Sequence, residues 1–194
     1  MIPLTVFTVG HSTRTIEEFM HLLIAHAIQH VIDVRSIPRS KRNPQFNRDQ
    51  LPMALQRFGI DYSHMPGLGG RRHARRDSTN TGWRNVSFRG YADYMDTPAF
   101  KESLNRCIAL AREERVALMC AEAVPWRCHR SLIADALLVR GIQVSDITSA
   151  MHARPYSLTP WARISGIDLT YPPEGFESGR ITSASMGNGR AERG

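Results

Sequence analysis

Short apolar runs alternate along the chain with segments in which apolar residues recur at helical spacing. This pattern predicts strands at about residues 4–9, 30–34, 60–65, 116–120 and 142–147. It predicts helices at about residues 16–27, 47–58, 88–95, 98–114 and 128–140. Strands that alternate with helices in this way pair in parallel. We therefore predict an α/β fold, a three-layer sandwich with a mainly parallel sheet in a single domain.

Three segments lack this pattern. Residues 66–85 are rich in Gly and Arg, and we expect a long surface loop there. Residues 151–173 contain several prolines and are expected to form an irregular cover segment over a domain that spans residues 1–150. Residues 174–194 are rich in Gly, Ser and Arg with few core-forming residues, which predicts a disordered tail.

Composition indicates which class of binding partner and which cellular compartment to expect. The 194 residues are 42% hydrophobic, enough for one core, and no apolar run is long enough to span a membrane. The three cysteines form no disulfide framework, and the first residues resemble a strand rather than a signal peptide, so we expect a cytoplasmic protein. The net charge of +7 favours an anionic partner, either a small molecule or a nucleic acid.

Reactive side chains follow the predicted strands. In a parallel α/β sheet, functional groups gather beyond the carboxyl ends of the strands. The residues at or just after these ends are His11, Ser12, Asp33, Arg35, His64, Cys120 and Glu122. We therefore expect a site along this edge of the sheet, in which His11 or Glu122 would transfer protons.

Cys128 is the strongest single candidate for a catalytic nucleophile. The pattern predicts it at a helix N-terminus beside Arg127 and Arg130, a setting that lowers the pKa of a thiol and favours a thiolate nucleophile. Either His129 or the distant His11 could serve as its base. Cys120 is a second candidate nucleophile. The alternative interpretation is that Cys128 is a small buried residue that packs the helix against the sheet.

Arginine and serine side chains supply candidates for anion binding, because guanidinium groups bind phosphate oxygens in a bidentate manner. The predicted anion-binding residues are Arg35, Arg39, Arg127, Arg130, Ser12 and Ser131. The free N–H groups at the start of the helix after Cys128 are expected to add an anion site.

Cysteine spacing argues against a metal or a redox pair. Cys120, Cys128, His129 and His11 have metal-ligating side chains, but seven residues separate the two cysteines, whereas zinc sites favour C-x₂₋₄-C pairs. We therefore predict no metal and no cofactor. The same spacing lacks the C-x-x-C geometry of redox pairs. Cys107 lies in an amphipathic helix and is expected in the core.

Several motifs resemble those of a bacterial and archaeal family known as domain of unknown function family 488. They are TVGHS, DVRSIPRS with Phe46 and Asn47, LGGRR, Phe88 with Tyr91 and Ala92, and LMCAEAVPWRCHRSLIAD followed by Gly141. The resemblance covers about residues 4–150 and implies a three-layer α/β domain with a shared site built from these motifs. The family often has two consecutive acidic residues after the first cysteine, where this chain has Ala121 and Glu122.

Three functions fit these observations. The first is an enzyme that acts on a phosphate-bearing, nucleotide or nucleic-acid substrate, with Cys128 or Cys120 as nucleophile. The second is a non-catalytic nucleotide- or nucleic-acid-binding module in which the arginines bind and the cysteines are structural. The third is a metal-dependent hydrolase with Cys and His ligands. Steep salt dependence of oligonucleotide binding would favour the binding module.

Overall fold

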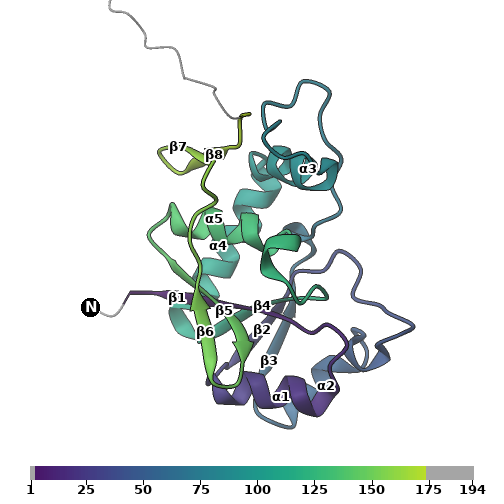
Figure 1. Ribbon diagram of the computed structural model, residues 1–194. Helices are drawn as coiled ribbons and strands as arrows, with labels where there is room; N and C mark the ends of the chain where they lie inside the picture. The colour runs from purple at the N-terminus through teal and green to yellow at the C-terminus, as the bar shows by residue number, and fades with distance from the viewer. Residues whose placement is uncertain (1–2, 174–194) are drawn as a thin grey trace, which may run out of the picture.

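A six-stranded sheet forms the centre of the computed structural model, which describes residues 3–173 (Figure 1). The strand order is β3-β2-β4-β1-β5-β6, and all strands are parallel except β6, which runs antiparallel to β5. The strands are β1 (Thr5–Gly10), β2 (His30–Asp33), β3 (Asp61–His64), β4 (Val116–Cys120), β5 (Gln143–Ser149) and β6 (His152–Pro155). The predicted α/β fold with a mainly parallel sheet is confirmed.

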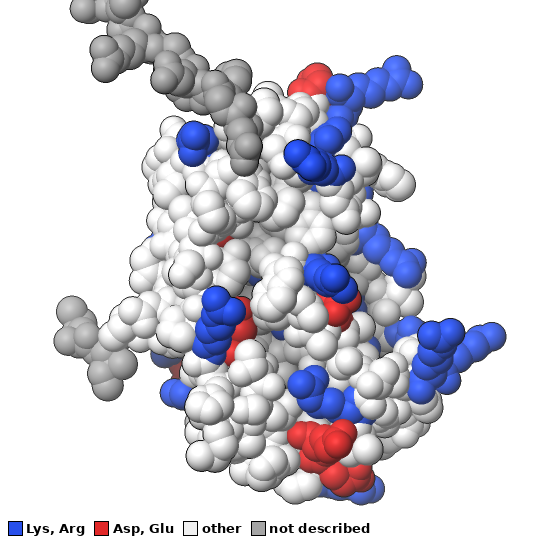
Figure 2. Space-filling view, viewed as in Figure 1, with Lys and Arg blue, Asp and Glu red and all other residues white. Residues whose placement is uncertain are grey.

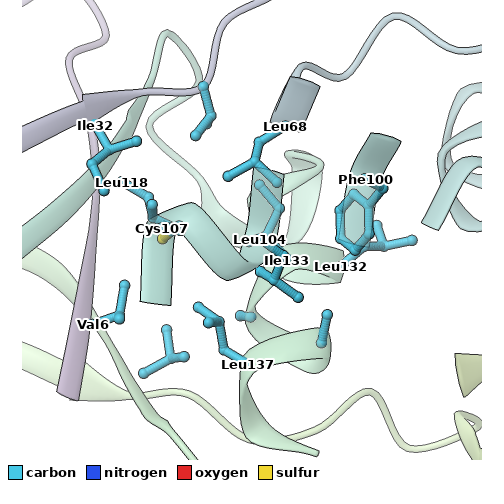
Figure 3. Packing of buried hydrophobic residues seen from close by; sticks show 14 of the residues in the cluster. Val6, Ile32, Leu68, Phe100, Leu104, Cys107, Leu118, Leu132, Ile133 and Leu137 are labelled. Atoms are coloured by element: carbon cyan, nitrogen blue, oxygen red, sulfur yellow. The ribbon is translucent and has the colours of Figure 1, made fainter. Parts of the chain in front are cut away.

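Helices cover both faces of the sheet and complete the three layers (Figure 1). They are α1 (Ile16–Ala25) and α2 (Leu51–Gln56) on one face, and α3 (Val86–Met95), α4 (Pro98–Glu113) and α5 (Arg130–Leu138) on the other. Thr15 caps α1 through a reciprocal pair of hydrogen bonds with Glu18. Apolar side chains from β1, β2 and β4 meet those of α4 and α5 in Figure 3, where Cys107 lies within the core as predicted.

Three local predictions were wrong. Helix α2 is shorter than predicted and begins at Leu51, because the side chain of Asn47 accepts a hydrogen bond from the Ser40 amide instead of capping a helix. Helix α5 begins at Arg130, not Cys128, because a 3₁₀ turn, η3 (Pro125–Arg127), precedes it. Residues 66–85 are not wholly a surface loop, since Leu68 and Asn80 are buried there.

The segment after β5 packs closely against the domain. Residues 151–173, expected as irregular cover, contain β6 and a hairpin of β7 (Arg163–Ser165) and β8 (Asp168–Thr170). The carboxylate of Asp135 on α5 accepts hydrogen bonds from the Tyr156 hydroxyl, the Thr159 amide and the Tyr171 hydroxyl at 2.8–3.0 Å. These bonds hold the segment against α5. The predicted disordered tail at 174–194 lies outside the described residues.

Candidate functional site

A pocket of about 660 Å³ opens at the carboxyl ends of β1, β2 and β4, the edge at which the sequence predicted a site. The predicted site residues that line it are His11, Ser12, Arg35, Arg39, Cys120, Glu122, Arg127, Cys128 and His129. Arg130, Ser131 and His64 do not line it. Gly10 ends β1 here, and a Cβ at this position would overlap with the backbone of Glu122, so only glycine lets the loop after β4 lie against β1.

Cys128 lies between three polar neighbours. Its Sγ is 3.4 Å from Nε of Arg130 and 3.7 Å from Nδ1 of His129. The Cys120 thiol also lies beside it, and one side-chain atom each of Cys120, Cys128 and His129 lie within 4.8 Å of one another. A thiol from the end of β4 and an imidazole and a guanidinium from the start of α5 therefore surround this sulfur.

These neighbours favour loss of the proton from Cys128 rather than from Cys120. The hydrogen bond from Cys120 lowers the pKa of Cys128 most, and His129 and the Arg130 guanidinium lower it further, against burial, which raises it. The hydrogen bond to Cys128, burial and the nearby charge raise the pKa of Cys120. The structure therefore favours Cys128 as a thiolate and Cys120 as a thiol.

Arg130 is buried at 1% exposure, so its charge needs a partner. Within the described residues, no carboxylate lies within 4.0 Å of its guanidinium. The group donates instead to the Cys128 sulfur, to Oγ1 of Thr8 and to the carbonyl of Glu122. The Cys128 sulfur is the nearest group that can carry a compensating negative charge, and Thr8 links the guanidinium to a second one, the buried carboxylate of Asp146.

The orientation of His129 is set from two sides. Its Nε2 lies 3.1 Å from the carbonyl oxygen of Val34, which can only accept a hydrogen bond, so Nε2 carries a hydrogen. Nδ1 therefore faces Cys128 either as a lone pair or, in the imidazolium, as a donor. Gly70 of the LGGRR motif lies against the ring, and Tyr91 packs beside it with ring centroids 5.1 Å apart.

Arg35 is committed to contacts within the protein. Its guanidinium forms a bidentate ion pair with Asp33, at 2.9 and 2.6 Å, and donates to the carbonyl of Phe46. Its remaining nitrogen lies 3.2 Å from Nε2 of His11. Arg35 therefore joins the ends of β1 and β2 to the following loop, and its guanidinium has little capacity left for a ligand.

His11 is held in its neutral form. Its Nδ1 lies 2.8 Å from the carbonyl of Ser12, and its ring stacks on Phe46 with centroids 4.2 Å apart. Burial lowers the pKa of His11 to about 4, and the nearby Arg35 lowers it further against the Ser12 carbonyl, which raises it. Both ring nitrogens contact protein groups, Nδ1 the Ser12 carbonyl and Nε2 the Arg35 guanidinium. His11 therefore forms part of the pocket wall and has no nitrogen free to transfer a proton.

Two groups that were predicted to bind an anion are bonded within the protein instead: the Ser131 hydroxyl and the amides at the start of α5. The Ser131 hydroxyl donates to the carbonyl of Cys128 at 2.9 Å and faces away from any ligand. The amides of Ser131, Leu132 and Ile133 donate to the carbonyls of Cys128 and His129. These three amides are therefore not free to bind an anion at this helix start.

Three exposed arginines remain available at the pocket wall: Arg39, Arg71 and Arg127. None of them makes a side-chain hydrogen bond or ion pair with another described residue. Arg71 was not among the predicted site residues, although it belongs to the LGGRR motif. Over the face in Figure 2, Lys and Arg lie in separate groups, some beside Asp and Glu, rather than in one continuous stripe.

Cys120, Cys128 and His129 have the side chains of a zinc site, and their spacing allows a shared ion. The buried guanidinium of Arg130 contacts the Cys128 sulfur, however, and would repel a divalent cation bound there. His11, the fourth candidate ligand, has both nitrogens engaged elsewhere. We therefore assign no metal to this cluster.

The described residues include no helix long and apolar enough to cross a membrane. No curated protein and no solved structure matches the chain. A family model described as "Domain of unknown function DUF488" matches residues 15–137, which include every predicted site residue except His11 and Ser12. Because the match covers more than half of the chain, this protein belongs to the DUF488 family.

Proposed function

We propose that this protein is an enzyme that uses the Cys128 thiolate as a nucleophile on a phosphate-bearing substrate, such as a nucleotide or a nucleic-acid end. The observation that carries the proposal is the placement of the Cys128 sulfur between Arg130 and His129 in the wall of an open pocket. A cysteine that only packs a helix needs neither a buried cation nor an imidazole beside its sulfur.

The substrate class follows from the charges of the pocket. Arg39, Arg71 and Arg127 come from three different loops and surround the same space. Exposed guanidinium groups that converge in this way favour phosphate oxygens. Glu122 is the only carboxylate among the lining residues, so the pocket is strongly cationic. Arg35 and Arg130 make hydrogen bonds within the protein that hold the pocket residues in place, and they do not bind the ligand.

The chemical step assigns a role to each remaining group. The Cys128 sulfur forms a bond to the electrophilic atom of the substrate, and the bond from that atom to its leaving group breaks. His129, whose Nδ1 faces the sulfur, passes a proton to the leaving group. Water then attacks the transferred group, His129 takes a proton from that water, and the thiolate is regenerated. The exposed carboxylate of Glu122 is close enough to the pocket to assist this proton transfer.

The experiment is alkylation of the native, reduced protein with iodoacetamide from pH 5 to pH 9, with mass-spectrometric assignment of each cysteine. Cys128 should react with a rate that stays high well below the ordinary thiol pKa of about 8.5. Cys107, buried in the core, is the internal control and should react only after denaturation. If Cys128 also stays unreactive until the protein unfolds, the proposed nucleophile is wrong.

A second arm tests the substrate class. Inorganic phosphate and adenosine monophosphate should each slow the alkylation of Cys128, and Arg127→Ala should weaken this protection. Arg112→Ala, which removes an exposed arginine at the end of α4, is the matched control and should leave it unchanged. The binding-module alternative predicts anion binding with a Cys128 that has an ordinary thiol pH profile.

A further inference from the structure

The second cysteine of the pocket has no role in the step above, yet its position is specific. Cys120 ends β4 and Cys128 follows η3, so seven residues separate them, but the fold brings both sulfur atoms within 4.8 Å. Both residues line the pocket, where a small oxidant can reach them. Spacing in the sequence gave no sign of this pair, because the intervening loop folds back on itself.

The loop between the two cysteines can accommodate a shorter sulfur–sulfur distance. Of its seven residues, the five exposed ones are Ala121, Glu122, Ala123, Trp126 and Arg127. The carbonyls of Ala121 and Glu122 are held by the Ser12 amide and the Arg130 guanidinium, so the movement would fall on the second half of the loop, where Trp126 and Arg127 are exposed and can move without disturbing the buried β4 and α5. A disulfide requires its sulfurs to approach to about 2.05 Å, and the loop is the element that would shift.

We propose that Cys120 and Cys128 form a redox pair in which a hydroperoxide oxidises Cys128 and Cys120 captures the product as an intrachain disulfide. In the first step the Cys128 thiolate attacks the peroxide, the O–O bond breaks, and the departing alkoxide or hydroxide takes a proton, which leaves Cys128 as a sulfenic acid. In the second step the Cys120 sulfur attacks that sulfenic acid, its thiol proton joins the departing hydroxide, and water leaves. A dithiol reductant restores both thiols by exchange.

The neighbours of the pair suit both steps. Arg130 and His129 face the Cys128 sulfur and hold the attacking thiolate. His129 can relay the proton from Cys120 to the departing hydroxide in the second step, since its ring belongs to the same three-residue cluster. Capture by Cys120 protects Cys128 from further, irreversible oxidation.

The pair also regulates the proposed enzyme. A disulfide removes the sulfur that would attack the substrate, so peroxide would switch the activity off and a dithiol would restore it. This consequence rests on the proposed function, but formation of the disulfide does not.

The experiment treats the reduced, full-length protein with a small excess of hydrogen peroxide in the presence or absence of dimedone, a reagent for sulfenic acids. Trypsin cleaves after Arg115, Arg127 and Arg130, so Cys120 and Cys128 fall in separate peptides. The wild-type protein should yield these two peptides joined, with a loss of about 2 Da for the pair. Reduction with dithiothreitol should separate them.

Cysteine-to-serine variants show which thiol takes part in each of the two oxidation steps. Cys120→Ser should lose the joined peptides and accumulate the dimedone adduct on Cys128, followed by higher oxides. Cys107→Ser, the matched control in the core, should form the joined peptides as the wild type does. Cys128→Ser should leave Cys120 unoxidised at the same peroxide dose.

The outcomes separate this proposal from the proposed function. If Cys128 is reactive at low pH but acquires dimedone equally in the wild type and in Cys120→Ser, the redox pair is wrong and the nucleophile stands. If the joined peptides form although phosphate and adenosine monophosphate protect nothing, the redox pair stands and the phosphate-bearing substrate is wrong. If Cys128 resists both iodoacetamide and peroxide, both proposals fail.

Discussion

The backbone of Gly70 lies directly against the imidazole ring of His129. A Cβ built on Gly70 would lie 2.5 Å from Nδ1, the ring atom that faces Cys128. Real Cβ atoms do not approach other atoms this closely, so any larger residue at this position must displace the ring. The LGGRR motif therefore sets the distance between the imidazole and the sulfur.

We expect Gly70→Ala to raise the pKa of Cys128 toward its ordinary value, because the displaced His129 ring no longer stabilises the thiolate. The measurement is the pH profile of Cys128 alkylation, which should shift to higher pH. Thr79→Ala, an exposed substitution in the same loop, is the control. An unchanged profile in Gly70→Ala would show that His129 does not influence the sulfur.

A double-mutant cycle tests the pairing of Arg130 with the Cys128 thiolate. Arg130→Met should lower the free energy of unfolding by about 3 kcal/mol, because it leaves a buried thiolate without its cation. The same substitution in a Cys128→Ser background should cost at least about 1 kcal/mol less, since the serine carries no charge. Urea unfolding at pH 7.5 measures all four proteins. Additive costs would mean that Cys128 is a neutral thiol in the native state.

The free energy of unfolding should decrease at acidic pH because His11 is buried in its neutral form. Its pKa lies near 4 in the folded protein and at the ordinary value of 6.5 in the unfolded chain. Between these two values the unfolded state binds a proton that the native state does not, so the free energy of unfolding decreases as the pH falls from 6.5 to 4. The contribution is at most about 3 kcal/mol.

His11→Gln should reduce this acid sensitivity, because glutamine retains a donor and an acceptor but does not titrate. The measurement is the difference between the unfolding free energies of the variant and the wild type across this pH range. Equal slopes for the two proteins would contradict a neutral, buried His11.

Asp135 should be among the residues most sensitive to substitution outside the pocket. It is fully buried and accepts three hydrogen bonds from the segment that follows β6. Asp135→Ala leaves the Tyr171 hydroxyl and the Thr159 amide without this acceptor and the Tyr156 hydroxyl with only the Thr159 hydroxyl at 3.5 Å, and should cost about 3 kcal/mol of unfolding free energy. Tyr171→Phe removes one of these bonds and should cost about 1 kcal/mol. A cost for Asp135→Ala no larger than for Tyr171→Phe would mean that the segment is held by its apolar contacts alone.

Periodicity and capping residues were sufficient to predict the sheet, its parallel strands and five helices, because these depend on local patterns. Thr15 and Thr97 cap α1 and α4, and the run from Val116 forms a fully buried central strand. The pattern did not reveal that β4 lies between β1 and β2, since strand order depends on tertiary packing.

The candidate site was predictable in its position but not in how its arginines are used. The rule that strand ends converge placed His11, Arg35 and Cys120 on one pocket, as observed. The sequence did not show that Asp33 forms an ion pair with Arg35 or that Arg130 is buried. An arginine in a sequence gives no sign of whether its guanidinium binds a ligand or a neighbouring side chain. The contact between Cys120 and Cys128 was missed because it depends on η3, a single turn with no periodicity.

Tyr171 is fully buried in the core cluster that contains α4 and α5, although it lies beyond the last strand of the main sheet. During synthesis, therefore, the pocket residues between His11 and His129 leave the ribosome well before the core behind them can close. At roughly 5–20 residues per second, translation from His11 to Tyr171 takes on the order of ten seconds. Through that interval the nascent chain exposes the apolar surface that Tyr171 covers in the finished protein.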